Sequence, residues 1–178
     1  MSPEFYDFLK ILVSVLFGMF AKSLHDFIRK KIMICREKKF ILSYLKNAIL
    51  ILPLLKDDYK KLQVFIRKTD YSILDINKFE GFDTELLKSI SFMRYYEIFN
   101  KQSNMFFEVY HMVNAIREDL PLPLHNKHIE KMRTIKNNPS KNSDSEVSQQ
   151  LDICEGIIKL KLDELNLLED RINKLINT

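Results

Sequence analysis

Apolar residues follow helical spacing through most of this chain, and one stretch near its start is apolar on every side. Residues 11–21 read Ile-Leu-Val-Ser-Val-Leu-Phe-Gly-Met-Phe-Ala and carry no charge. A membrane-spanning helix needs about 20 mostly apolar residues, and residues 5–24 reach that length by including Asp7, Lys10 and Lys22. Lys10 lies near one end, where its ammonium group can extend to the headgroups. The pattern predicts a transmembrane helix with a small margin.

Two other interpretations of this segment stay open, a buried core helix and the apolar region of a signal peptide. Signal peptides begin with a basic region and carry a small-residue cleavage site. Here Glu4 and Asp7 precede the run, and no such site comes before Lys22. The same acids disfavour a mitochondrial transit peptide, which is Arg-rich and poor in acids. We therefore expect a membrane anchor and basic juxtamembrane segment over residues 1–34.

The charges on either side of the run set its expected orientation. Positive residues near a membrane segment stay on the cytoplasmic side, and most cations follow the run rather than precede it. We expect a single pass, with the N-terminus outside and the bulk of the chain in the cytoplasm. The cations expected to contact anionic lipid headgroups are Lys22, Arg29, Lys30, Lys31, Arg36, Lys38 and Lys39.

The next stripe has a period of 3.5 residues, which is typical of a helix packed along a seam. Residues 40–55 are apolar enough to suggest a second membrane pass, but Lys46, Asn47 and Pro53 interrupt them and the stripe continues into polar sequence. We prefer a cytoplasmic helix kinked near Pro53, with the membrane hairpin as the alternative. The stripe comprises Ile41, Leu45, Ala48, Leu52, Leu55, Tyr59, Leu62 and Ile66.

Three further helices are predicted after residue 84. The first covers about residues 85–118, with a break near residues 95–100, and Asp83 or Thr84 is expected to cap it after the turn Phe79–Phe82. Pro121 and Pro123 are expected to end it, and a shorter helix follows over residues 124–136. A mobile linker is expected at 137–145. The face expected to be buried carries Phe99, Phe106, Val109, Val113 and Ile116.

The closing segment repeats apolar residues every seven positions and predicts a long C-terminal helix. Lys161 alone interrupts this seam, and Ile153, Leu160 and Leu167 are expected to widen its buried face. We expect packing within an all-α helical bundle over residues 35–178, and an intermolecular coiled coil stays open. The seam expected to mediate bundle packing or self-association comprises Leu151, Cys154, Ile158, Leu165, Leu168, Ile172 and Leu175.

Composition narrows the function classes. The chain has 178 residues, 29% of them charged, and a net charge of +4. The cations cluster beside the apolar run, so the remainder lacks the broad basic face of a nucleic-acid binder. Cys35 and Cys154 are too few for a disulfide framework. Cys154 is expected in the core, and palmitoylation is the alternative to an ordinary reduced thiol at Cys35.

No catalytic motif is present. With 3 glycines the chain has no phosphate-binding loop, and it has no nucleophile elbow, H-E-x-x-H or C-x-x-C pair. His125 and His128 share a helical face and could be imagined as metal ligands, but we expect them on a solvated helix end. Acids such as Asp57 and Asp58 are expected on the surface. We therefore expect no enzyme, cofactor or metal site.

The order of elements resembles small bacterial membrane-anchored helical proteins of unassigned function. The likeness covers about residues 35–176: an amphipathic helix with Asn47, an F-x-x-F-D-T turn at residues 79–84, a helix with Tyr110 and Asn114, and a Leu-rich closing helix. It implies the bacterial inner membrane as location, and no activity or catalytic residue.

Three function classes are consistent with these patterns. The leading one is a membrane-anchored scaffold or sensor that binds a protein partner or itself. The second is a toxin or antiphage-defence effector that disrupts the membrane, in which Lys10, Ser14 and Gly18 would line one face of an assembled helix. The third is an accessory subunit of a larger membrane complex.

Overall fold

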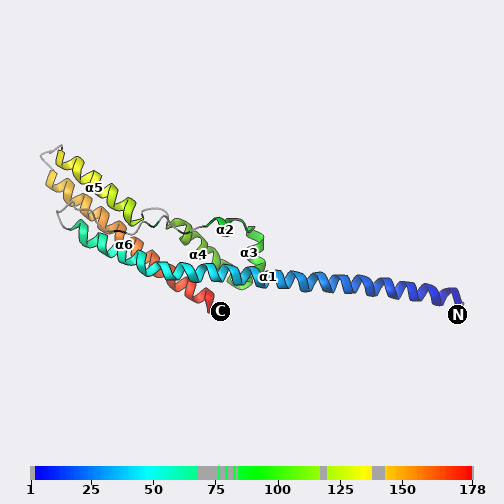
Figure 1. The fold of residues 1–178 in the computed structure, drawn as a ribbon. Helices are drawn as coiled ribbons and strands as arrows, with labels where there is room; N and C mark the ends of the chain where they lie inside the picture. Colours follow the sequence, from blue (N-terminus) through cyan, green and yellow to red (C-terminus); the bar gives the residue numbers. More distant parts are fainter. Residues whose placement is uncertain are drawn as a thin grey trace. The chain divides into compact units, whose positions relative to one another are not determined.

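The computed structural model describes residues 3–67, 76, 79, 82, 84–116, 120–137 and 143–177. All regular structure in these residues is helical, and none of them forms a strand. The prediction of an all-α protein is confirmed. The elements are α1 (Pro3–Ile66), α2 (Glu85–Lys88), α3 (Phe92–Phe99), the 3₁₀ turn η1 (Asn100–Gln102), α4 (Ser103–Ala115), α5 (Pro121–Asn137) and α6 (Ser143–Ile176). Figure 1 labels the six α-helices of the described residues.

The predicted anchor and the predicted helix that follows it form one continuous helix, α1, of 64 residues. Pro53 lies inside this helix. A proline ring removes one backbone donor, so the carbonyl of Ile49 loses its usual partner, yet the helix continues to Ile66. By its contacts the chain divides into two units, residues 1–41 and residues 42–178.

The stripe of period 3.5 in α1 is buried at every position from Ile41 to Ile66. On the opposite side Leu50 and Leu54 are exposed. A helix with one buried face and one exposed face is the ordinary result of packing against protein. One face of residues 40–55 is therefore covered by other parts of the chain.

Within residues 42–178, the other long helices all contact helix α6. It contacts α4 and α5, and these helices lie beside it in Figure 1. Ion pairs connect it to α1 at Lys56–Glu169 and to the residue after α1 at Arg67–Glu155, where Nε and Oε1 lie 2.6 Å apart. A further ion pair, between Arg171 Nε and Glu108 Oε2 at 3.2 Å, connects it to α4.

The helix predicted over residues 85–118 is divided into α2, α3, η1 and α4. Ser91 begins α3, because its Oγ accepts the backbone N–H of Arg94 at 3.3 Å. Asn100 ends α3 with a φ of 47°, a conformation that non-glycine residues rarely adopt. The predicted break near residues 95–100 is thus present, and the one at residues 89–91 was not predicted.

The apolar face predicted for this region is buried and is rich in stacked aromatic rings. Phe106 lies 4.3 Å from Phe99 and 4.5 Å from Tyr95, between ring centroids. Phe82 is buried as well, 5.2 Å from Phe79. Thr84 occupies the N-cap position of α2 without a side-chain capping bond, and Asp83 lies outside the described residues.

The helix predicted over residues 124–136 begins earlier than predicted, because Pro121 and Pro123 lie in the first turn of α5. The first turn of a helix tolerates proline, since its missing N–H would have no partner there. The predicted linker 137–145 is shorter at both ends. Asn137 is the last residue of α5, and α6 begins at Ser143. Residues 138–142 lie outside the described residues.

Candidate functional site: the exposed apolar part of α1

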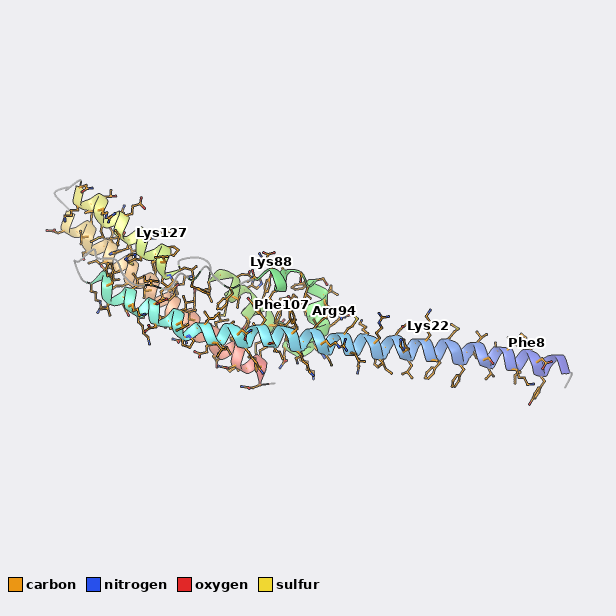
Figure 2. All side chains as sticks on the ribbon, viewed as in Figure 1. Phe8, Lys22, Lys88, Arg94, Phe107 and Lys127 are labelled. Atoms are coloured by element: carbon orange, nitrogen blue, oxygen red, sulfur yellow. The ribbon has the colours of Figure 1, made fainter. Side chains whose placement is uncertain are left out.

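The first part of α1 exposes large apolar side chains on all its faces. Residues 6–24 rise about 28 Å at about 1.5 Å per residue, close to the roughly 30 Å of a bilayer's hydrocarbon core. Figure 2 shows Phe8 and Lys22 projecting from this part of the helix. The exposed apolar residues are Tyr6, Phe8, Leu9, Ile11, Leu12, Val13, Val15, Leu16, Phe17, Met19, Phe20, Leu24, Phe27, Ile28, Ile32 and Met33.

A surface of this kind is unusual for a soluble helix. Soluble monomers rarely expose contiguous apolar patches larger than a few hundred Å², and the described residues of the chain provide no cover for this one. Helix α1 is the one helix among the described residues that is long and apolar enough to cross a membrane, judged by length and composition.

Lys10, Ser14 and Gly18 all lie on the exposed surface of this part of α1. A Cβ built on Gly18 would meet nothing within 4 Å, so the helix surface there is open. The ammonium group of Lys10 lies 3.7 Å from Asp7 Oδ1 and 4.9 Å from the ring centroid of Tyr6. The ammonium group of Lys10 thus already has a carboxylate and an aromatic ring as neighbours within its own helix.

The cations after the apolar run are spread around α1. Lys22, Arg29, Lys30, Lys31, Arg36 and Lys39 are exposed and Lys38 is half-buried. Lys31 lies over the ring of Phe27, 5.0 Å from its centroid, so its stem covers apolar surface while its charge stays accessible. Cys35 is a free, exposed thiol among these cations.

In α6 the heptad seam is buried within the chain at every position except Leu151, which is half-buried. Burial raises the pKa of the Cys154 thiol to about 11, and neighbouring Glu155 adds to the shift. The sequence analysis expected Ile153, Leu160 and Leu167 to widen the buried face of α6. This expectation is wrong, because these three side chains are about half exposed. The helix has enough neighbours to cover the seam but not this second stripe.

Two polar features are placed differently from the sequence-based expectation. His125 and His128 are buried rather than solvated, because α5 packs this face against the other helices. Burial, and then the proximity of His125, lower the pKa of His128. Asp58 is buried while Asp57 is exposed. Asp58 lies three residues after Leu55 and four before Leu62 of the α1 stripe, so it borders the same helical face, and this spacing is the signal that could have indicated its burial.

The described residues contain no cluster of three or more side chains able to hold a metal ion. Lys161 interrupts the buried seam as predicted, and its ammonium group lies 3.0 Å from Glu164 Oε2, one turn along α6. Comparison with known proteins adds no assignment: no family model matches this chain, and no curated protein or solved structure shows significant similarity to it.

Proposed function

We propose that this protein is anchored in a membrane by the first part of α1 and that its remaining helices act without catalysis, by binding a protein partner or a second copy. The exposed apolar surface of residues 6–33 carries this proposal, since lipid would cover it at no cost in exposed polar backbone. The continuous α1 would connect the anchor directly to the packed helices.

The proposed orientation is a single pass with the N-terminus outside and residues from Lys22 onward in the cytoplasm. The support is the positive-inside rule together with the exposed cations at Lys22, Arg29, Lys30, Lys31, Arg36 and Lys39. Each cation near an anionic membrane surface contributes about 1 kcal/mol of attraction. These residues would therefore hold the juxtamembrane part of α1 against the headgroups.

Membrane fractionation with carbonate extraction tests the anchor. The double variant Val13→Arg/Leu16→Arg adds about 5–7 kcal/mol to the insertion free energy at mid-membrane, so it should leave the membrane fraction. The matched control is Leu50→Arg, at an exposed position of the same helix beyond the proposed span. A chain beginning at Lys39 should be soluble and helical.

The outcomes separate the topologies. Release of the double variant alone supports one pass through residues 6–24. Release by Leu50→Arg as well would favour the second pass through residues 40–55. Retention of the double variant in the carbonate pellet would contradict the anchor.

A second candidate function, membrane disruption by assembled α1 helices, is favoured by the open surface at Gly18 and its alignment with Lys10 and Ser14. Small and polar residues mark helix contacts in lipid. Under this candidate, Lys10→Leu would stay membrane-bound but lose assembly and toxicity on overexpression. Leakage of cells expressing the wild-type chain, abolished by Lys10→Leu, would favour membrane disruption over the scaffold. Copurification of one fixed partner would instead favour an accessory subunit of a larger membrane complex.

A further inference from the structure

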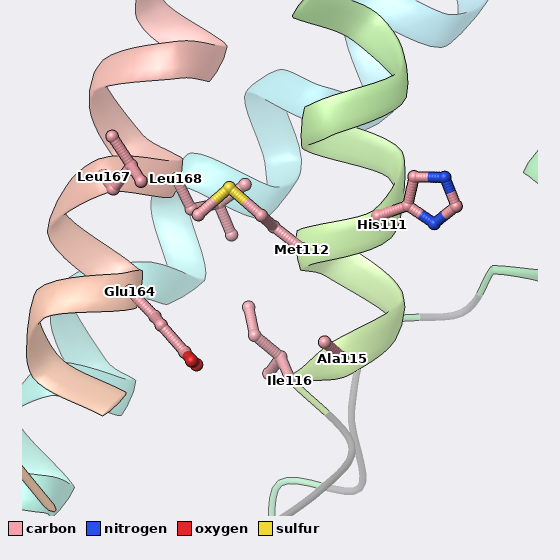
Figure 3. A pocket seen from close by; sticks show the side chains of 7 residues that line it. All are labelled: His111, Met112, Ala115, Ile116, Glu164, Leu167 and Leu168. Carbon is pink, nitrogen blue, oxygen red and sulfur yellow. The ribbon is translucent and has the colours of Figure 1, made fainter. Parts of the chain in front are cut away.

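A groove of about 340 Å³ opens between α4 and α6. Its walls are apolar: Met112, Ala115 and Ile116 come from α4 and the residue after it, and Leu167 and Leu168 come from α6. Figure 3 shows the Met112 side chain extending from α4 toward Leu168. The volume lies at the lower end of the range of small-molecule sites, about 300–1,000 Å³.

Leu167 provides exposed apolar surface to one wall of the groove. Its side chain is 48% exposed although it was expected to be packed, and it stands beside the fully buried Leu168. Leu167 and Leu168 form one wall of the groove, and the α4 residues opposite form the second wall. The groove is therefore a built feature of α4 and α6 packing rather than a single exposed residue.

Glu164 supplies the polar group of the site. In Figure 3 its carboxylate points between the two helices, near Ile116, whereas the His111 ring lies on the side of α4 away from α6. Oε2 accepts a hydrogen bond from Lys161 at 3.0 Å, and no described residue donates to Oε1. One acceptor atom is thus available at the edge of an apolar groove.

The charge at the site selects against ions. Lys161 is buried and pairs with Glu164, so the two charges already compensate each other. A charged ligand would have no counterion of its own in the groove, and an unpaired charge in apolar surroundings is costly. A neutral molecule with one N–H or O–H donor loses nothing in this way and gains a hydrogen bond to Oε1.

We propose that the groove between α4 and α6 binds a neutral, apolar small molecule that donates one hydrogen bond to Glu164 Oε1. All its residues lie within 42–178, so the inference does not depend on the membrane anchor. A ligand here would contact α4 and α6 together and would stabilise their packing, since anything that binds the folded state alone raises its stability.

Photolabelling of the full chain in lipid vesicles tests the proposal. The probe is 4-(hydroxymethyl)benzophenone, which is neutral and carries one O–H donor, and 4-ethylbenzophenone has the same shape without the donor. Activated benzophenones insert into C–H bonds, and methionine side chains react readily. Met112 lines the groove, whereas Met93 is exposed on α3 and reports non-specific labelling. Met19, on α1, reports probe dissolved in lipid.

We expect saturable labelling at Met112 and non-saturable labelling at Met93. The hydroxymethyl probe should label Met112 at about tenfold lower concentration than the ethyl probe, the effect of one hydrogen bond to a charged acceptor. Ala115→Phe should abolish the Met112 adduct by filling the groove. Glu164→Leu should remove the preference for the hydroxymethyl probe, whereas Glu164→Gln, which keeps an acceptor oxygen, should retain part of it.

Labelling of Met112 that is no stronger than that of Met93, or that persists in Ala115→Phe, would overturn the site. An unchanged preference for the hydroxymethyl probe in Glu164→Leu would overturn the role of the carboxylate. Circular dichroism of each variant shows whether its helices are intact, and the Met93 adduct provides an internal reference if a variant loosens. Failure of the membrane anchor would appear separately, as loss of the Met19 adduct.

Discussion

The imidazole of His125 packs against the ring of Phe65, with the ring centroids 4.9 Å apart and the planes inclined at 51°. This contact joins α5 to the last turn of α1. His128 follows one turn later on α5 and is buried too. Within the described structure, Nε2 of His125 and Nδ1 of His128 have no hydrogen-bond partner. Burial therefore favours the neutral imidazole at His128.

We predict that acidification destabilises the protein through His128. Burial and the proximity of His125 lower its pKa in the folded state, while in the unfolded chain it is near the ordinary value of about 6.5. Below about pH 6.5 the unfolded chain takes up the proton first, so the free energy of unfolding falls as the pH drops through this range. Denaturant titrations at about pH 7.5 and about pH 5 measure the loss.

His128→Leu should flatten this dependence, because it removes the group that binds the proton. His111→Gln is the matched control, since His111 is exposed, and it should leave the loss unchanged. An equal acid-induced loss in His128→Leu and the wild type would assign the effect to other groups.

A second prediction concerns the Lys161–Glu164 ion pair in α6, in which Lys161 is buried and Glu164 is partly exposed. Lys161→Met should raise the free energy of unfolding by about 1 kcal/mol, because it restores an apolar residue to the seam and leaves Glu164 partly solvated. Glu164→Ala should lower it by about 1–3 kcal/mol, because the buried ammonium group loses its acceptor. Chemical denaturation measures both, and a destabilised Lys161→Met would show that the ion pair is a net stabilising contact.

The sequence predicts the packed stripes better than it predicts how many neighbours each helix has. Leu52 and Leu165 are buried as helical spacing requires. Leu160 has the same heptad regularity and is exposed, because the helices that contact α6 cover one side of it. His125 and Asp58 are buried although they are polar: packing from other elements covers positions that the sequence analysis assigned to solvent because of their side-chain polarity.

Substituting alanine at Leu165 and, separately, at Leu160 measures the difference between a buried and an exposed apolar position of α6. Leu165→Ala should cost about 3 kcal/mol of unfolding free energy, the usual loss for a buried leucine. Leu160→Ala, five residues earlier on an exposed face, should change it by no more than about 0.5 kcal/mol. The two side chains are 2% and 56% exposed. A large loss at Leu160, measured by denaturation, would indicate that an additional partner covers this stripe.

Asn100 provides a test of backbone strain at the junction of α3 and η1. Its φ of 47° and ψ of −115° lie outside the regions that side chains with a Cβ favour. Such a conformation costs about 1–3 kcal/mol, and glycine adopts it freely. Asn100→Gly should therefore raise the midpoint of thermal unfolding, and Asn100→Ala should not. A lower midpoint for Asn100→Gly would mean that the asparagine side chain stabilises this turn.

Gly156 offers the opposite case, a glycine that the fold does not require. It lies in the interior of α6, on the exposed side, and an added Cβ would meet nothing within 4 Å. Alanine at an exposed helix position is more favourable than glycine by about 0.5–1 kcal/mol, because it loses less backbone entropy on folding. Gly156→Ala should raise the free energy of unfolding by that amount, measured by denaturation of the full chain. A loss instead would mean that another helix approaches α6 closely at Gly156.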